Sequence, residues 1–355
     1  MNTFIQKNIG SQVLLLDALK QNMYWVKNSF KVNNNLGSSK YKTSWGRWAS
    51  DYPETTGYLI PTLINSSELL KDKSLHTLAE QQVTYFKSLQ LCSGGFAIEK
   101  GNAKSYVFDS AQILIGLINL YNSNKNNDIL LMIKHCYSWL INSLNNNGKF
   151  ESSNYKNNYN PSYYSRIVWS FFNAESILNV KSEKSLTLYH HMKSLLNTNG
   201  TFNDCSFDGS SFAFTHNLIY SYRGLWESAI EIDDNSFMVV LKNHLLSITQ
   251  KIIKDRHFNG EYNNEWKTQS RFICTTGNAQ LVTLLLSVFG TEYEDILKAC
   301  QILINPLLNQ QKKMTLFNKG AIPSSIPVWE KYQRFRYTNW TQKFYSDALI
   351  KLLTT

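Results

Sequence analysis

The segment 215–223 holds three side-chain types that can act together on the hydrogen next to a sugar carboxylate. It contains His216, Tyr220, Tyr222 and Arg223 in that order. A neutral histidine can take up this proton, an arginine can neutralise the carboxylate, and a tyrosine can return a proton. His216 and Tyr220 are four residues apart, so they share one face of a helix. The residue types predict lyase or epimerase chemistry at a uronate, with the catalytic residues His216, Tyr222 and Tyr164.

A different chemistry needs two acidic side chains. Glycoside hydrolysis generally uses a pair of carboxyl groups roughly 5–9.5 Å apart, one of them a proton donor. Glu54 and Asp109 each lie at the start of an apolar segment and form such a candidate acid/base pair. Either residue could instead serve only its helix, Asp109 as a cap and Glu54 through the helix dipole. A glycoside hydrolase is therefore the alternative prediction, and a non-catalytic glycan-binding or scaffold subunit of polysaccharide biosynthesis is a further one.

These side chains are positioned by an internal repeat. A turn that ends in glycine, any residue and an aromatic residue recurs, with its glycine at positions 94, 148, 200 and 260, and a weaker copy has Gly320. The period of 50 to 60 residues is too long for a single helix and fits a pair of helices. Before each turn stands an amphipathic helical segment, and after a polar loop comes a more apolar one.

The apolar segments start alike. Each begins with a residue that commonly caps a helix through its side-chain oxygen, namely Thr55, Asp109, Ser165, Thr215, Thr276 and Asn339. Gln112 and Gln342 follow two of these residues at the spacing of a capping box. The sequence therefore predicts six apolar helices with side-chain caps.

Six pairs of amphipathic and apolar helices predict an all-α fold, an (α/α)6 toroid that forms a single domain over residues 1–355. The apolar helices would form the inner wall, and the segment around 5–25 would be the first outer helix. All inner helices would start at one rim, so that their positive dipole ends face a central cavity. An open solenoid is the alternative, because repeat length alone does not prove closure.

Arginine is unevenly placed along the chain. Six of the seven arginines lie just before an apolar helix or within its first two turns, whereas the lysines are scattered. Arginine suits bidentate carboxylate binding, and aromatic rings suit sugar rings. The predicted substrate-binding residues are therefore arginines, aromatic residues and asparagines near this rim: Arg47, Trp48, Tyr58, Arg166, Trp169, Arg223, Arg271, Asn278, Arg336, Asn339 and Trp340.

Over residues 40 to 350 the repeats resemble the α/α-toroid superfamily that includes squalene-cyclase and prenyltransferase-like repeats. Segments 51–62, 108–112 and 337–344 are further similar to toroid proteins encoded in bacterial capsule and exopolysaccharide clusters. The acidic Asp-x-Asp-Asp motif of the cyclase relatives and the zinc ligands of the prenyltransferase relatives have no match. The resemblance therefore implies a carbohydrate-active protein of polysaccharide metabolism rather than terpenoid chemistry.

Composition narrows the partners. The formal net charge is +10, but most lysines stand singly and no basic run or nucleic-acid module is present. We expect an acidic oligosaccharide or polysaccharide as the partner, no nucleic acid, no membrane insertion and a cytoplasmic location. The five dispersed cysteines form no Cys-x-x-Cys pair, so we expect buried free thiols, no metal and no cofactor. The sequence does not indicate an oligomeric state.

Overall fold

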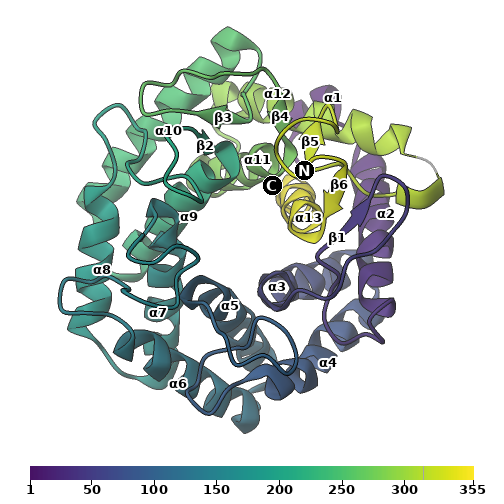
Figure 1. Ribbon diagram of the computed structural model, residues 1–355. Helices are drawn as coiled ribbons and strands as arrows, with labels where there is room; N and C mark the ends of the chain where they lie inside the picture. Colours follow the sequence, from purple (N-terminus) through teal and green to yellow (C-terminus); the bar gives the residue numbers. More distant parts are fainter. Residues whose placement is uncertain (315) are drawn as a thin grey trace.

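Alternating amphipathic and apolar helices fold into a ring of six hairpins, each with one outer and one inner helix (Figure 1). The computed structural model describes residues 1–314 and 316–355. The outer helices are α2 (Gln12–Lys31), α4 (Lys73–Leu89), α6 (Asn127–Asn142), α8 (Glu183–Ser194), α10 (Asn235–Asp255) and α12 (Glu294–Lys313). The inner helices are α3 (Pro53–Leu70), α5 (Val107–Asn124), α7 (Ser165–Leu178), α9 (Thr215–Glu231), α11 (Thr275–Phe289) and α13 (Asn339–Thr354). A short helix, α1 (Thr3–Asn8), packs on α12.

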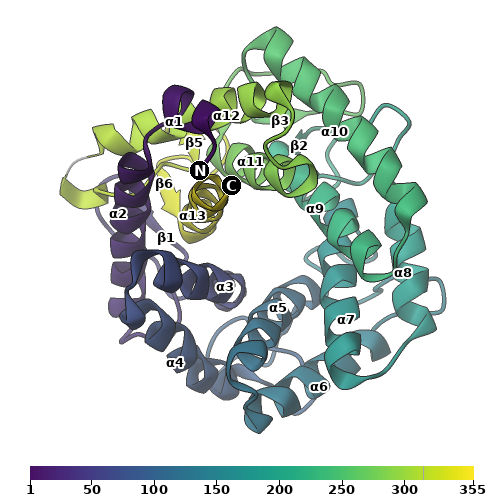
Figure 2. The same ribbon diagram turned by 180° about the vertical axis from the view of Figure 1, so that it is seen from behind.

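The ring is closed by its last inner helix. Each inner helix packs on the next, and α13 packs on both α11 and α3, as the view from behind also shows (Figure 2). Strand β1 (Tyr41–Thr43) pairs antiparallel with β6 (Arg336–Thr338), with Tyr41 opposite Thr338. These contacts confirm the predicted toroid and exclude the open solenoid.

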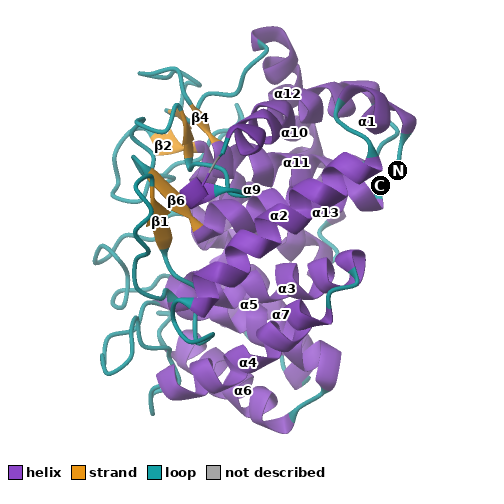
Figure 3. Ribbon diagram, turned by 90° about the vertical axis from the view of Figure 1, so that its right-hand side faces the viewer, coloured by secondary structure: helices purple, strands orange, loops and turns teal. Residues whose placement is uncertain are grey.

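All six inner helices begin on one face of the ring, which we call the loop face (Figure 3). This face also carries the long loops and the short strands β2 (Ala213–Phe214), β3 (Glu261–Tyr262), β4 (Ile273–Cys274) and β5 (Ser325–Ile326), and the 3-10 helices η1 (Ser162–Tyr164) and η2 (Leu316–Asn318). The two chain ends lie on the opposite face, which we call the terminal face.

The inner helices start within two residues of the predicted positions, but the predicted side-chain caps are wrong. None of the six makes a side-chain cap hydrogen bond. Ser165 Oγ donates to the carbonyl of Ser221 at 3.0 Å instead, and Thr276 Oγ1 lies 2.7 Å from Thr341 Oγ1. Gln112 accepts from Arg166 rather than closing a capping box. The polar residues at these starts therefore connect neighbouring segments of the ring.

The contact between α3 and α5 depends on two glycines. A Cβ atom on Gly57 would stand 2.5 Å from the Cα of Ile113, and one on Gly116 would overlap the carbonyl oxygen of Gly57. The two backbones therefore approach closely because neither residue has a side chain. The helices brought together here are those that carry Glu54 and Asp109.

The cysteines are free, as the sequence predicts. Cys136, Cys205, Cys274 and Cys300 are buried, whereas Cys92 is exposed, so the prediction of a buried thiol is wrong for Cys92. Burial raises the pKa of the Cys205 thiol to about 11 and that of Cys274 to about 11. These two thiols are therefore protonated at neutral pH and pack as apolar groups.

Candidate functional site

Two buried carboxyl groups meet near the loop face, on neighbouring inner helices. Glu54 lies in the first turn of α3 and Asp109 in the first turn of α5, with exposed fractions of 6% and 3%. Glu54 accepts a hydrogen bond from Thr55 Oγ1 at 3.1 Å. Asp109 accepts one from the hydroxyl of Tyr155, in the loop between α6 and α7. The structure thus brings together the two residues of the predicted hydrolase pair.

Burial raises the pKa of both carboxyl groups. It raises the pKa of Glu54 to about 8, with repulsion from Asp109 as the next cause. It raises the pKa of Asp109 to about 7, while the Tyr155 hydroxyl and the Lys40 ammonium group act in the opposite direction. Both carboxyl groups therefore hold a proton to a higher pH than exposed carboxyl groups do, and their mutual repulsion opposes ionisation of both at once. A pair with one protonated and one ionised member can serve as acid and base.

The protein is expected to lose stability as the pH rises from about 6.5 to about 8. Glu54 and Asp109 have pKa values of about 8 and about 7 in the folded state, against about 4 in an unfolded chain. Their contribution is complete below the unfolded values and is lost as the pH rises through the folded ones. His216 affects stability only below this pH window, because burial lowers its pKa from 6.5 to about 3. Lys343, with a pKa of about 8, affects stability only above it.

Urea unfolding at a series of pH values across this window measures the effect. A double variant, Glu54→Gln with Asp109→Asn, is expected to flatten the decline, because neither amide titrates. A wild-type stability that rises between pH 6.5 and 8 would contradict the raised pKa values of the pair.

An aromatic layer lies across the inside of the ring, next to the carboxyl pair and one turn deeper. We define it by six residues that are all at most 5% exposed: Tyr58, Phe108, His216, Tyr220, Tyr332 and Phe344. The ring of His216 lies 4.3 Å from that of Tyr220, and the ring of Phe344 lies 5.5 Å from that of Tyr220. The Nδ1 atom of His216 lies 3.1 Å from Gln280 Oε1. The layer closes the inside of the ring toward the loop face.

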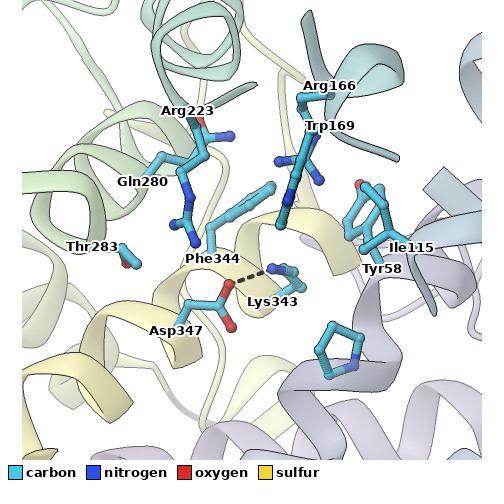
Figure 4. Close-up of a pocket in the computed structure, with 11 residues that line it drawn as sticks. Tyr58, Ile115, Arg166, Trp169, Arg223, Gln280, Thr283, Lys343, Phe344 and Asp347 are labelled. Carbon is cyan, nitrogen blue, oxygen red and sulfur yellow. Dashed lines mark hydrogen bonds and ion pairs between the residues drawn. The ribbon is translucent and has the colours of Figure 1, made fainter. Parts of the chain in front are cut away.

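A central pocket adjoins this layer, with Tyr58 and Phe344 in both. Figure 4 shows the residues that line the pocket. It encloses about 440 Å³, its open mouth included. Residues of all six inner helices line it, in their second and third turns for the most part: Tyr58, Pro61, Ile115, Arg166, Trp169, Arg223, Gln280, Thr283, Lys343, Phe344 and Asp347. The accessible space inside the ring thus lies deeper along the inner helices than their first turns.

The pocket opens toward the terminal face. Residues one turn further toward the C-terminal ends of the inner helices, such as Asn65, Asn173 and Ser287, are partly or fully exposed. Those one turn or more toward the loop face, such as Glu54 and Thr276, are buried. The pocket is therefore blind at the aromatic layer and open at the opposite end.

Four of the predicted substrate-binding residues line this pocket, namely Tyr58, Arg166, Trp169 and Arg223. Arg166 is 3% exposed, and its Nε donates to Gln112 Oε1 at 2.7 Å. Its guanidinium carbon lies 4.6 Å from the centre of the Tyr220 ring. Arg223 pairs with Glu227 one turn along α9. The sequence signal from arginine therefore identifies two residues of the pocket.

The remaining predicted residues lie elsewhere. The Tyr222 hydroxyl donates to the carbonyl of Gly200 at 2.6 Å, and that of Tyr164 donates to Asn154 Oδ1 at 3.0 Å. The structure does not bring Tyr222 to His216, because the two side chains leave α9 on different faces. Three others make buried bonds: Asn278 to Leu303, Asn339 to Ser39 and Trp340 to Tyr332. Arg47, Arg271 and Arg336 are exposed on the loop face, and Trp48 packs on Trp25.

Several residues of the site carry no signal in the sequence. Lys40 acts on both carboxyl groups from a loop, and Tyr155 reaches Asp109 from a loop in the next repeat. Gln280 contributes a polar group from the second turn of α11. Lys343 and Asp347 form an ion pair, which their spacing of four residues indicates. Of these residues, only Lys343 and Asp347 could be predicted from the sequence, through that spacing.

Within the described part of the chain, no group of three or more His, Cys, Asp or Glu side chains is placed to hold a metal ion. The described helices also include none that is long and apolar enough to cross a membrane.

Comparison with known proteins gives the fold. No family model matches the chain, and no curated protein matches it. Several solved structures match over nearly their whole length. An unsaturated glucuronyl hydrolase specific for heparin has a TM-score of 0.74 at 13% identity, covering 96% of this chain and 97% of its own. Cellobiose 2-epimerase from Bacillus thermoamylovorans has a TM-score of 0.73 at 12% sequence identity, and the match covers 96% of this chain and 98% of the epimerase.

A third structure is a mutant of an unsaturated glucuronyl hydrolase from Streptococcus agalactiae, complexed with dGlcA-GalNAc6S. It has a TM-score of 0.70 at 11% identity, covering 96% of this chain and 91% of its own. At such low identities these likenesses establish a shared toroid fold. They leave the chemistry to be argued from the side chains of this chain.

Proposed function

We propose that this protein hydrolyses a glycosidic bond in an acidic carbohydrate, with Glu54 as general acid and Asp109 as general base. The observation that carries the proposal is the buried carboxyl pair, whose pKa values are raised to about 8 and about 7. Glu54 gives its proton to the oxygen of the leaving group, while Asp109 takes a proton from the water that attacks the sugar carbon. Such a pair is the usual requirement for glycoside hydrolysis.

A cationic group near the pair supports an acidic substrate. Lys40 acts electrostatically on both carboxyl groups, and its ammonium nitrogen lies 4.3 Å from the centre of the Tyr52 ring. A substrate with a negative charge would be attracted to this group. The neighbours of known fold include hydrolases of unsaturated glucuronyl sugars, which supports the same substrate class. A role in capsule or exopolysaccharide metabolism remains a prediction from the sequence.

Lyase or epimerase chemistry with His216 as base has weaker support. Burial lowers the pKa of His216 to about 3, which makes its imidazole a weak base. The proposed acid, Tyr222, is bonded to Gly200 away from His216. Because the fold is similar to that of a cellobiose epimerase, the experiment below also measures epimerisation. The carboxyl pair meets the needs of hydrolysis more completely than these residues meet those of elimination or epimerisation.

A panel of acidic oligosaccharides tests the proposal. Hydrolysis is expected to release new reducing ends without forming an unsaturated uronate and without exchanging carbon-bound hydrogen for solvent deuterium. An unsaturated product would favour the lyase, and deuterium incorporation would favour the epimerase. Binding of these glycans without any turnover would favour the non-catalytic glycan-binding role.

Tyr155→Phe is expected to move the acid limb of the pH–rate profile upward by about one pH unit. The Tyr155 hydroxyl donates to Asp109 and lowers its pKa, and a hydrogen bond to a charged group contributes about 1.5–3 kcal/mol. Without it Asp109 holds its proton to higher pH, so the base is lost earlier on acidification. Tyr159→Phe is the matched control, because the Tyr159 hydroxyl in the same loop bonds Ser206 instead. Equal profiles for both variants would contradict the role of Tyr155.

A further inference from the structure

The central pocket faces away from the carboxyl pair. Glu54 precedes Tyr58 by one turn of α3, which places it about 6 Å nearer the loop face. Tyr58 and Phe344 belong both to the aromatic layer and to the lining of the pocket. The layer therefore separates the pair from the pocket, and a ligand that enters from the terminal face meets a surface distinct from the pair.

Three cationic side chains line this pocket. They are Arg166, Arg223 and Lys343. Asp347 pairs with Lys343, and Glu227 pairs with Arg223 at the mouth. Arg166 forms no ion pair with any of the described residues, although it is 3% exposed. Among the lining residues and their ion-pair partners, three cations stand against two carboxylates, and the cation without an ion pair is the most deeply buried of the three. Glu54 also acts on Arg166, but its own pKa is raised to about 8.

The electrostatics of these groups favour an added anion. Burial lowers the pKa of Arg166, and Arg223 is among the further causes. Burial lowers the pKa of Lys343 to about 8, and both arginines contribute to this shift while Asp347 opposes it. The three cations are therefore close enough to repel one another. A bound monoanion would relieve that repulsion at little cost, because the site is already formed.

Neutral groups of the pocket suit a polyhydroxylated ligand. Arg166 uses its Nε toward Gln112, and no hydrogen bond to a described residue occupies its two terminal nitrogens. Gln280 turns its oxygen to His216, which leaves its amide nitrogen for the pocket. Pro61 and Ile115 supply an apolar wall.

We propose that the central pocket binds a sugar acid, a single sugar unit with one carboxylate, which enters from the terminal face. The carboxylate pairs with Arg166 and Arg223, and the hydroxyl groups bond Gln280 and Asp347. The proposal goes beyond hydrolysis at the loop face and does not depend on it. It assigns a second ligand site to the same ring.

Calorimetric titration with D-glucuronate tests this site, with D-glucose and inorganic sulfate as comparison ligands. We expect glucuronate to bind at least tenfold more tightly than either. Arg166→Gln and Arg223→Gln are each expected to weaken glucuronate at least tenfold. Arg47→Gln and Arg271→Gln are matched controls, since they make the same change on exposed loop-face arginines. Thermal unfolding of each variant identifies any that fails to fold.

The direction of entry is tested by blocking the mouth. Ser287→Cys, in a Cys92→Ser background that removes the exposed native thiol, places a label at the terminal face. A bulky maleimide there is expected to abolish glucuronate binding, whereas the same label on Ser211→Cys at the loop face leaves it unchanged. Glu54→Gln is expected to keep binding, so that a failed hydrolase assay and a failed binding site are told apart.

Three results would overturn the proposal. Glucuronate that does not bind the wild-type protein would remove the site. Sulfate that binds as tightly as glucuronate would reduce it to a simple anion site. Binding that persists in Arg166→Gln and Arg223→Gln, or that is blocked only from the loop face, would place the ligand elsewhere.

Discussion

Glu54→Gln and Asp109→Asn are each expected to lower the rate of glycoside hydrolysis by about 10²–10⁴-fold, the usual contribution of a general acid or base. Neither amide can exchange a proton in the pH range of the reaction. Both are close in size to the residues they replace, so the walls of the site stay in place. The measurement is the release of reducing ends from the best acidic oligosaccharide substrate.

The control variants are Asp208→Asn and Glu265→Gln, which make the same changes on exposed carboxylates of the loop face. They are expected to keep full activity. Thermal unfolding at pH 8 separates chemistry from folding, because removing a buried carboxyl with a raised pKa is expected not to lower stability there. Full activity of Glu54→Gln and Asp109→Asn would exclude the carboxyl pair as the catalytic group.

Gly116→Ala is expected to destabilise the protein by up to about 2 kcal/mol. The added Cβ atom overlaps the carbonyl oxygen of Gly57, which is backbone and cannot rotate away. Overpacking of this kind costs about 1–3 kcal/mol or more, and the better helix propensity of alanine returns only about 1 kcal/mol. Because α3 and α5 also carry the carboxyl pair, hydrolysis is expected to fall with stability. The measurement is the free energy of unfolding in urea.

Gly10→Ala is the matched control for Gly116→Ala. A Cβ atom on Gly10 meets only the side chain of Leu14, which can turn aside. We expect the free energy of unfolding of this variant to lie within about 0.5 kcal/mol of the wild-type value, as is common for surface substitutions. Equal stabilities of the two alanine variants would show that α3 and α5 can separate without cost.

The ring itself could be predicted from the sequence because its signal is periodic. The turns at Gly148 and Gly200 mark repeats of nearly equal length, and Ser165, Thr215 and Asn339 are the first residues of their helices as predicted. The capping roles of those residues could not be predicted in the same way. Their side chains find partners such as Ser221, which lies on the next inner helix, and no local pattern encodes that contact.

The chemistry of the site depends on contacts between distant segments. The residue types suggest that His216 acts with Tyr222. The two residues are six positions apart on one helix, however, and therefore lie on different faces of it. Glu54 and Asp109 belong to different repeats, and only the packing of α3 on α5 makes them a pair. Tyr155 and Lys40 lie in loops whose course no helical period describes. Sequence reasoning could therefore propose the pair as an alternative but could not rank it first.

Ring closure has a consequence for how the protein is made. Asn22 in α2 donates a hydrogen bond to Gln342 in α13 at 2.8 Å, across 320 positions of the chain. An open solenoid can fold repeat by repeat, since each repeat meets only its neighbours. Here α3 needs α13 as well as α5, so high contact order makes its completion slow. During synthesis on the ribosome, the first inner helix lacks one of its two neighbours until α13 has emerged.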